Sequence, residues 1–388
     1  MSESGRNHTT EAGSGTPDAV ADPPPVDPFN DDAPPELDDV RAGENLDWVV
    51  IEAYLRRNLP SDLELDGDLR VQQFPNGSAN LTYLIAFGPT ELVLRRPPFG
   101  TLAPGAHDMK REYKVLSALW QIFDKAPRAY LFCDDHEVIG ADFFVMERRR
   151  GEVVRGVVPP SMRHHANVGH RLGLALVDAM AEFHLLDPDV VGLGDLGRPD
   201  GFVERQVRGW KRRWDLVADP AYDKAMTDIH ATLERSLPGA QRVSFVHNDL
   251  KLDNCMFDPA DPDRVTAFFD WDMTTLGDPL IDLGTLLNYW PDPSDPAGSG
   301  RFSNEGLAAM GLPGRVEVAA RYGERTGLDV SNAPWYEAFA QWKTATVVQQ
   351  LHHRWLVGDS TDERMATIAD RLPMLVANAS SLLATIKS

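Results

Sequence analysis

The 388-residue sequence has few cysteines, a deficit of basic residues and no long apolar run. The two cysteines, Cys133 and Cys255, lie far apart, which argues against a disulfide scaffold or a cysteine zinc site and favours a reducing compartment. The 59 Asp and Glu residues outnumber 38 Lys and Arg residues, and the net charge of −21 argues against a nucleic-acid partner. No uncharged apolar run approaches the roughly 18 residues that span a bilayer, and no secretory signal pattern is present. We therefore expect a cytoplasmic protein without a membrane or nucleic-acid partner.

The acidity is concentrated at the N-terminus. Residues 1–44 contain eleven acidic and two basic residues, a net charge of −9, so the remaining 344 residues carry −12. Only five Val, Leu, Ile or Phe residues occur in this segment, and it is rich in proline. Such a composition cannot bury enough apolar surface to offset the entropy lost on ordering. The sequence predicts a disordered, acidic tail over residues 1–44.

After the tail, the hydrophobic pattern changes from mixed to mainly helical. In the first part, helices are predicted at residues 47–59 and 108–120, and strands at residues 69–74, 81–87, 91–95, 129–132 and 143–146. Further on, helices are predicted at residues 171–186, 202–214, 221–237, 279–290, 316–326, 334–356 and 363–386. The pattern predicts an α+β protein with a β-rich N-terminal lobe (residues 45–147) and a helical C-terminal lobe (residues 148–388).

The strongest chemical signal is the sequence HNDLKLDN at residues 247–254, which fits the pattern H-x-D-x-x-x-x-N after an apolar run. A second apolar run ends at Asp270, sixteen residues after Asn254. Phosphoryl transfer needs a carboxylate that orients the acceptor hydroxyl and oxygen ligands that hold Mg²⁺ against the phosphates. Asp249 fits the first role, and Asn254 and Asp270 fit the second. These residues predict an enzyme that uses ATP and Mg²⁺.

Short motifs elsewhere occur in an order that is specific in combination. They are FPNGSANLTYL at residues 74–84, VLRRPP at 93–98, REY at 111–113, VME at 145–147, DW at 270–271 and GDPLIDL at 277–283. Over about residues 41–380, the sequence resembles the aminoglycoside phosphotransferase and choline kinase family, and within it the kinase-like domain of acyl-CoA dehydrogenase family members ten and eleven. This resemblance implies a protein-kinase-like fold, with a small antiparallel sheet and one key helix in the N-terminal lobe.

The resemblance also implies roles for residues outside the catalytic loop. Arg95 would contact the α- and β-phosphates, and Glu112 on the next helix would be its ion-pair partner. Arg95 shares a strand face with Val93, whereas Arg96 points to the opposite face. Lys251 would stabilise the transferring phosphoryl group.

Two further segments would complete the nucleotide site by the same resemblance. The turn with Gly77, Ser78 and Asn80 would cover the phosphates with backbone N–H groups. Backbone groups near Met146, Glu147 and Arg148 would bind adenine where the lobes meet.

Local interpretations compete with functional ones for several residues. His247 is interpreted as structural, and Asp278 as the cap of the following helix. The family resemblance implies that Asp282 bonds the catalytic loop from below. The basic residues of the predicted helix at 202–214 are read first as a solvated face, with a site for the phosphates of coenzyme A as the alternative.

The predicted substrate is a small molecule with a hydroxyl group, for which the resemblance favours a hydroxyacyl-CoA or a related metabolite. An aminoglycoside is the second candidate. A protein kinase is a weaker alternative, because DWD replaces D-F-G and GDP follows almost at once, leaving no room for an activation loop. A pseudokinase-type binding module is a further alternative, against which the complete set of Asp249, Asn254 and Asp270 argues.

Overall fold

The computed structural model describes residues 37–75, 80–100, 108–292, 295, 305–360 and 362–386. Most of the predicted tail, residues 1–36, lies outside this part. The sequence assigns residues 37–44 to the disordered tail as well, but the structure places them against the first sheet. The backbones of Asp38 and Gln73 exchange hydrogen bonds of 2.9 and 2.8 Å, and the Glu44 carbonyl accepts one of 2.6 Å from the Tyr83 hydroxyl. The predicted tail boundary is therefore wrong at residues 37–44. The backbone of this segment hydrogen-bonds to the edge of the sheet, and composition does not reveal such a pairing.

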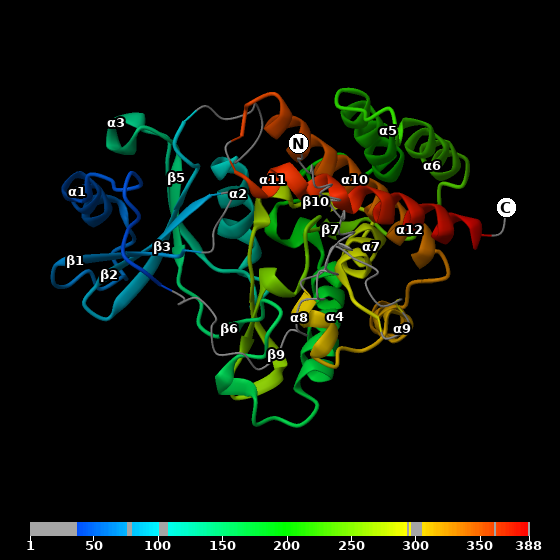
Figure 1. The fold of residues 1–388 in the computed structure, drawn as a ribbon. Helices are drawn as coiled ribbons and strands as arrows, with labels where there is room; N and C mark the ends of the chain where they lie inside the picture. Colours follow the sequence, from blue (N-terminus) through cyan, green and yellow to red (C-terminus); the bar gives the residue numbers. More distant parts are fainter. Residues whose placement is uncertain are drawn as a thin grey trace, which may run out of the picture.

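Five antiparallel strands form the N-terminal sheet, in the order β1-β2-β3-β5-β4 (Figure 1). The strands are β1 (Leu69–Gln73), β2 (Leu81–Phe87), β3 (Thr90–Arg96), β4 (Ala129–Cys133) and β5 (Phe143–Glu147). Three helices accompany them, namely α1 (Trp48–Asn58), α2 (Met109–Leu119) and α3 (His136–Ile139). All five predicted strands and both predicted helices of this lobe are confirmed, whereas the single turn of α3 is not predicted from the sequence.

The two faces of β3 contact different helices. Leu92 and Leu94 lie in a hydrophobic cluster with α1, whereas Val93 lies in the main core with α2. Because side chains alternate along a strand, Arg95 lies on the Val93 face, toward α2 and the C-terminal lobe. The alternation of side-chain direction along β3 thus puts Arg95 on the face that packs against α2.

The C-terminal lobe is mainly helical. Its helices are α4 (Val168–Leu185), α5 (Phe202–Asp215), α6 (Asp223–Arg235), α7 (Leu280–Tyr289), α8 (Glu305–Ala309), α9 (Arg315–Thr326), α10 (Ala333–Leu356), α11 (Arg364–Thr367) and α12 (Leu372–Ala384). Two small antiparallel sheets lie between them. One pairs β7 (Ser244–Val246) with β10 (Thr275–Gly277), and the other has the order β6 (Glu152–Val153), β8 (Cys255–Asp258) and β9 (Asp261–Phe268). This arrangement confirms the predicted α+β fold with two lobes.

Helices α7 and α10 pack closely against each other in the C-terminal lobe. A Cβ atom on Gly284 of α7 would lie 2.4 Å from the carbonyl carbon of Tyr336 on α10, a distance that only glycine permits. This close approach places two residues beside the catalytic loop, Asp282 near the start of α7 and Lys343 on α10.

The predicted single helix at residues 363–386 is wrong, since the structure divides it into α11, a 3-10 turn (Ile368–Arg371) and α12. Pro373 occupies the first turn of α12. Its ring restrains the residue before it and removes a backbone donor, so a helix can begin there but cannot run through. Within the part of the chain that the structure describes, no helix has the length and apolar character needed to cross a membrane.

Candidate active site

The catalytic loop begins where β7 ends. The buried carboxylate of Asp282 accepts hydrogen bonds from the backbone N–H of His247, at 2.6 Å, and of Asn248, at 2.7 Å. The His184 ring nitrogen lies 3.1 Å from the same carboxylate. Burial opposes the charge of Asp282, but the hydrogen bond and charge of His184 outweigh it, so the pKa of Asp282 is lowered. An ionised carboxylate therefore fixes the start of the loop from below, as the sequence predicts.

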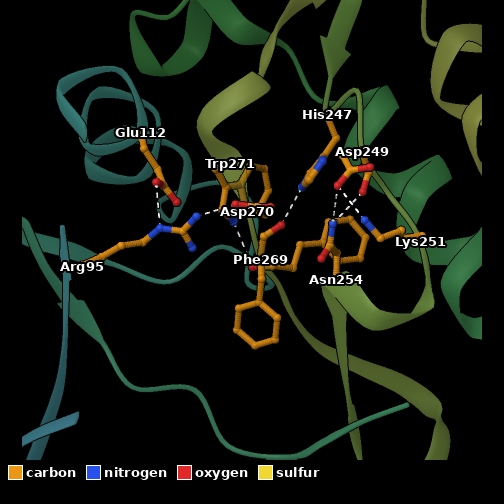
Figure 2. A network of polar contacts seen from close by, with 10 residues as sticks. Arg95, Glu112, His247, Asp249, Lys251, Asn254, Phe269, Asp270 and Trp271 are labelled. Atoms are coloured by element: carbon orange, nitrogen blue, oxygen red, sulfur yellow. Dashed lines mark hydrogen bonds and ion pairs between the residues drawn. The ribbon is translucent and has the colours of Figure 1, made fainter. Parts of the chain in front are cut away.

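His247 joins the catalytic loop to the segment that carries Asp270. Its Nε2 atom lies 2.8 Å from the carbonyl oxygen of Phe269 (Figure 2). Its side chain is fully buried and packs against Trp271, with ring centroids 5.2 Å apart. These contacts agree with the structural interpretation of His247. They also hold the two carboxylate-bearing segments at a fixed separation.

Three predicted residues of the catalytic loop contact one another (Figure 2). The Asp249 carboxylate accepts hydrogen bonds from Lys251 Nζ at 2.7 Å and from Asn254 Nδ2 at 3.0 Å. Asn254 Nδ2 also donates to the Asp249 carbonyl at 2.8 Å. Because the amide nitrogen is used in both contacts, the amide oxygen of Asn254 is left for another ligand.

Nearby carboxylates favour the protonated form of Lys251. Burial opposes the protonated form, but the carboxylates of Asp249 and Asp253 outweigh it and raise the pKa of Lys251. The ammonium group is therefore positively charged next to Asp249. It also lies 5.5 Å from the ring of Tyr289 at the end of α7. A permanent cation at this position can neutralise a phosphoryl group that approaches Asp249.

Asp270 follows β9 and adopts a left-handed backbone conformation, with φ of 65°. The following turn (Trp271–Met273) buries Trp271 in the core, so the chain reverses and the Asp270 carboxylate turns toward the space between the lobes. Left-handed backbone is uncommon outside glycine, although Asp tolerates it better than most residues. With this conformation, the chain turns directly after β9, so that Trp271 is buried and the Asp270 carboxylate faces the site.

Arg95 connects the N-terminal lobe to Asp270. Its Nε atom lies 3.1 Å from Glu112 of α2, and its Nη2 atom forms an ion pair with Asp270 (Figure 2). Burial opposes the charge on Asp270, but Arg95 outweighs it and lowers the pKa of Asp270. Arg96 is directed elsewhere, with its guanidinium 4.0 Å from the ring centre of Phe99. The structure therefore directs Arg95, not Arg96, into the site.

Glu112 has an unusual environment for a carboxylate. It is almost fully buried, and burial raises the pKa of Glu112 to about 7 although Arg95 acts in the opposite direction. The nearby charges of Asp270 and Asp272 raise it further. The ion pair with Arg95 is therefore sensitive to protonation in the neutral range.

A pocket of about 230 Å³ lies on the Arg95 face of the N-terminal sheet, lined by Arg70, Gln72, Leu84, Ala86 and Glu91. Residues opposite each other on neighbouring strands share a face. Leu84 is opposite Val93 in the register of β2 and β3, which puts this pocket on the face that carries Arg95. These lining residues are not among those predicted from the sequence, although the alternation that orients Arg95 also predicts their direction.

The predicted adenine-binding segment lies next to this pocket. Met146 is opposite Val93 in the sheet, and Arg148 forms an ion pair with Glu91. The backbone N–H of Glu147 donates to the Arg128 carbonyl at 2.8 Å. Met146 and Arg148 thus border the pocket, whereas the N–H of Glu147 already has a partner within the protein.

The predicted phosphate-binding turn is only partly described. Gly77 and Ser78 lie outside the described residues. Asn80 is buried immediately before β2. β2 pairs with β3, and Thr82 lies opposite Arg95. Asn80 thus directly precedes the strand that pairs with the Arg95 strand, and the role of this turn stays a prediction.

The donor set suits Mg²⁺. Asp270 offers a carboxylate and Asn254 an amide oxygen, and Mg²⁺ prefers oxygen ligands and is usually bound by one or two protein groups together with water and substrate phosphates. Across residues 37–386, with their gaps, no group of three or more His, Cys, Asp or Glu side chains could hold a metal ion by itself. An ion held by Asp270 and Asn254 would take its remaining ligands from water and substrate phosphates.

Comparisons with known proteins agree with this geometry. A sequence model described as the phosphotransferase enzyme family matches residues 70–319. Acyl-CoA dehydrogenase family member 11 of Gallus gallus is 32% identical over 336 residues, which cover 85% of this chain and 42% of the relative. Family member 10 of Mus musculus is 29% identical over 314 residues, covering 80% of this chain and 29% of the relative. The chain thus spans less than half the length of these relatives.

Solved structures show the same fold. A protein of Ralstonia eutropha assigned to the aminoglycoside phosphotransferases superposes with a TM-score of 0.73 at 27% identity, covering 89% of this chain and all of that one. A spectinomycin phosphotransferase in complex with ADP and spectinomycin has a TM-score of 0.55 at 10% identity, covering 88% and 99%. These structures confirm the predicted protein-kinase-like fold. The chain therefore belongs to the phosphotransferase enzyme family, and its assignment as an ATP-dependent phosphotransferase with an alcohol acceptor is confirmed.

Proposed function

We propose that this enzyme transfers the γ-phosphoryl group of ATP, with Mg²⁺, to a hydroxyl of a hydroxyacyl-CoA or a related hydroxylated metabolite. The observation that carries the proposal is the convergence of Asp249, Lys251 and Asn254 from the catalytic loop with Asp270 and Arg95 across the lobe interface. Each of these residues has a task in phosphoryl transfer.

The proposed step follows from the position of Asp249. The acceptor hydroxyl lies against this carboxylate, and its oxygen forms a bond to the γ-phosphorus. The bond between the γ-phosphorus and the β,γ-bridging oxygen breaks, and ADP leaves with the electron pair. The hydroxyl proton passes to Asp249. Lys251 and Arg95 offset the phosphate charge, so that positioning and electrostatics supply most of the rate.

Asn254 and Asp270 would hold Mg²⁺, which neutralises charge on the β- and γ-phosphate oxygens when bound. Arg95 contacts Asp270 in the structure, so it lies where it can also reach a phosphate. Leu84 and Val93 would form the apolar roof over adenine, and Met146 and Arg148 its edge. Gly77 and Ser78 would cover the phosphates, as the family resemblance implies.

The substrate class is supported by the relatives. The names of the two curated relatives describe acyl-CoA dehydrogenases, and the matching region accounts for less than half of each. A kinase domain carried on such a protein suits a hydroxylated acyl-CoA. The second candidate is an aminoglycoside, because a related structure contains hygromycin B and another contains spectinomycin.

The test is phosphoryl transfer by the purified chain with Mg·ATP. The acceptors are 3- and 4-hydroxyacyl-CoAs, kanamycin, choline and a generic protein substrate. We expect transfer to a hydroxyacyl-CoA that is lost in Asp270→Ala. The matched control is Asp261→Ala, at the exposed start of β9, the strand that Asp270 follows, and it should retain transfer. Transfer to kanamycin alone would establish the second candidate, and ATP binding without transfer to any acceptor would indicate a binding module.

A further inference from the structure

Helix α5 is rich in basic residues, but most of those at its surface are paired. Arg208 forms ion pairs with Glu204 at 2.7 Å and with Glu234 at 3.3 Å, and Lys211 forms one with Asp215. Exposed pairs of this kind describe a solvated face, the first interpretation of this helix. These residues do not form a free cationic surface.

Arg213, two residues before the end of α5, is different. Its guanidinium lies 4.3 Å from the ring centre of Trp210, and within the described ranges no carboxylate forms an ion pair with it. Lys343 of α10 approaches the same indole, with Nζ 5.6 Å from the ring centre. Lys343 also has no carboxylate ion-pair partner among the described residues. Two cations without carboxylate partners therefore share one aromatic ring.

Helix α5 packs against α10 (Figure 1), and at this contact Arg213 of α5 and Lys343 of α10 approach the same indole ring. A tryptophan ring favours nearby cations, which explains how both are tolerated at this position. Arg213 is exposed and Lys343 is half-buried, so the pair remains open to a ligand. Arg213 and Lys343 with Trp210 are called the α5–α10 cation pair below.

The α5–α10 cation pair adjoins the catalytic loop. Lys343 Nζ donates a hydrogen bond of 3.1 Å to the carbonyl of Asn248, the residue before Asp249. Burial lowers the pKa of Lys343, against the opposing charges of Asp249 and Asp282, and the nearby charge of Arg213 lowers it further. Two like charges near each other in a partly dehydrated place are unfavourable, and an anion bound between them would relieve the repulsion.

We propose that Arg213 and Lys343, held over Trp210, bind an anionic group of the acceptor next to Asp249. This inference rests on the proposed phosphotransferase function and assigns its substrate class, a hydroxyl compound that also carries phosphate or carboxylate. A polycationic acceptor is disfavoured at this place. Of the basic residues on α5, only Arg213 belongs to the α5–α10 cation pair and would bind substrate. Arg208 and Lys211 form surface ion pairs instead.

The experiment compares steady-state kinetics of the full chain with Mg·ATP and three acceptors that share one hydroxyacyl group. The acceptors are the hydroxyacyl-CoA, the free hydroxy acid and the uncharged hydroxyacyl-pantetheine. The variants are Arg213→Gln, Arg213→Lys and Arg208→Gln, the last being a matched control on the same helix. Lys343→Met serves as the second variant, with the KM for ATP measured throughout.

We expect Arg213→Gln to raise the KM for the anionic acceptor about tenfold, with kcat and the KM for ATP changed less than about twofold. Arg213→Lys should restore most of the affinity, and Arg208→Gln should resemble the wild type. Lys343→Met should raise the same KM and also lower kcat, because it contacts the catalytic loop. A larger effect on the CoA ester identifies phosphate as the bound group, and a larger effect on the free acid identifies carboxylate.

Unchanged KM values in Arg213→Gln and Lys343→Met, with transfer intact, would overturn the inference and leave the proposed function standing. An equal rise for hydroxyacyl-pantetheine would overturn it as well, because that acceptor has no anion. If the wild type transfers phosphate to none of the acceptors while binding Mg·ATP, both the proposed function and the inference fail.

Discussion

Replacing Asp282 by asparagine should disable the enzyme without touching any residue that meets substrate. Asp282 is fully buried and accepts hydrogen bonds from the backbone N–H groups of His247, at 2.6 Å, and Asn248, at 2.7 Å. In Asp282→Asn, one of the two oxygens becomes an NH₂ group, which faces a donor in either orientation. At least one charge-assisted hydrogen bond is lost, worth about 1.5–3 kcal/mol, and a buried N–H is left unpaired at a further cost of about 1–3 kcal/mol.

Together these terms predict a loss of about 2.5–6 kcal/mol in the free energy of unfolding, measured by urea denaturation. The loop displacement should also lower kcat by about two orders of magnitude, since an error of about 1 Å at the reacting atoms has that effect. The matched control is Asp278→Asn. Asp278 is also buried and accepts from the Tyr336 hydroxyl at 2.6 Å and the Leu280 N–H at 3.0 Å, but it does not contact the catalytic loop.

Asp278→Asn should therefore be destabilised while retaining kcat within about threefold, a smaller loss than the loop displacement produces. If both variants keep normal kcat, the idea that Asp282 holds the loop is refuted. If both lose activity in proportion to stability, the effect is general unfolding and the same idea fails.

Three further predictions concern other parts of the molecule. Because burial raises the pKa of Glu112 to about 7, folding takes up a proton there, and this contribution to stability is lost as the pH rises from about 4.5 through 7. Unfolding curves of Glu112→Gln should lack that component, and identical pH dependence in both proteins would contradict it. Arg95→Met should weaken Mg·ATP binding by about tenfold or more in calorimetry, whereas Arg96→Met should not, because only Arg95 faces the site. Gly284→Ala should lower the free energy of unfolding by about 1–3 kcal/mol, because its Cβ would lie 2.4 Å from the Tyr336 backbone, and Gly239→Ala, with open space around it, is the control.

Much of the N-terminal lobe could be predicted from local pattern. The strands are short runs rich in apolar residues, and the alternation of side-chain direction along a strand correctly predicts the direction of Arg95. The helix after them begins at Asp108, whose side chain caps it by accepting from the Arg111 N–H. The catalytic loop was predictable for a related reason, since HNDLKLDN places its functional residues close together in the chain.

The remaining features depend on contacts between segments that are distant in sequence. Lys343 lies beside the catalytic loop because α10 packs on α7 and α5, and nothing near residue 343 indicates that neighbour. Lys343 is the single lysine of α10 and lies in a largely buried part of that helix. This indicates a specific role for Lys343 but does not identify its neighbour. Pro373 is also a local signal for a break in the helix, but the apolar spacing of residues 363–386 predicts one continuous helix.

In the proposed transfer from Mg·ATP, Asp249 receives the proton of the acceptor hydroxyl. The most direct measurement is transfer of the γ-phosphoryl group of ATP to a hydroxyacyl-CoA by the wild type and by Asp249→Asn, together with calorimetric binding of Mg·ATP to both. We expect Asp249→Asn to bind Mg·ATP with nearly normal affinity and to lose at least about a hundredfold in kcat, within the range of a general base. Equal kcat values for the two proteins would contradict it.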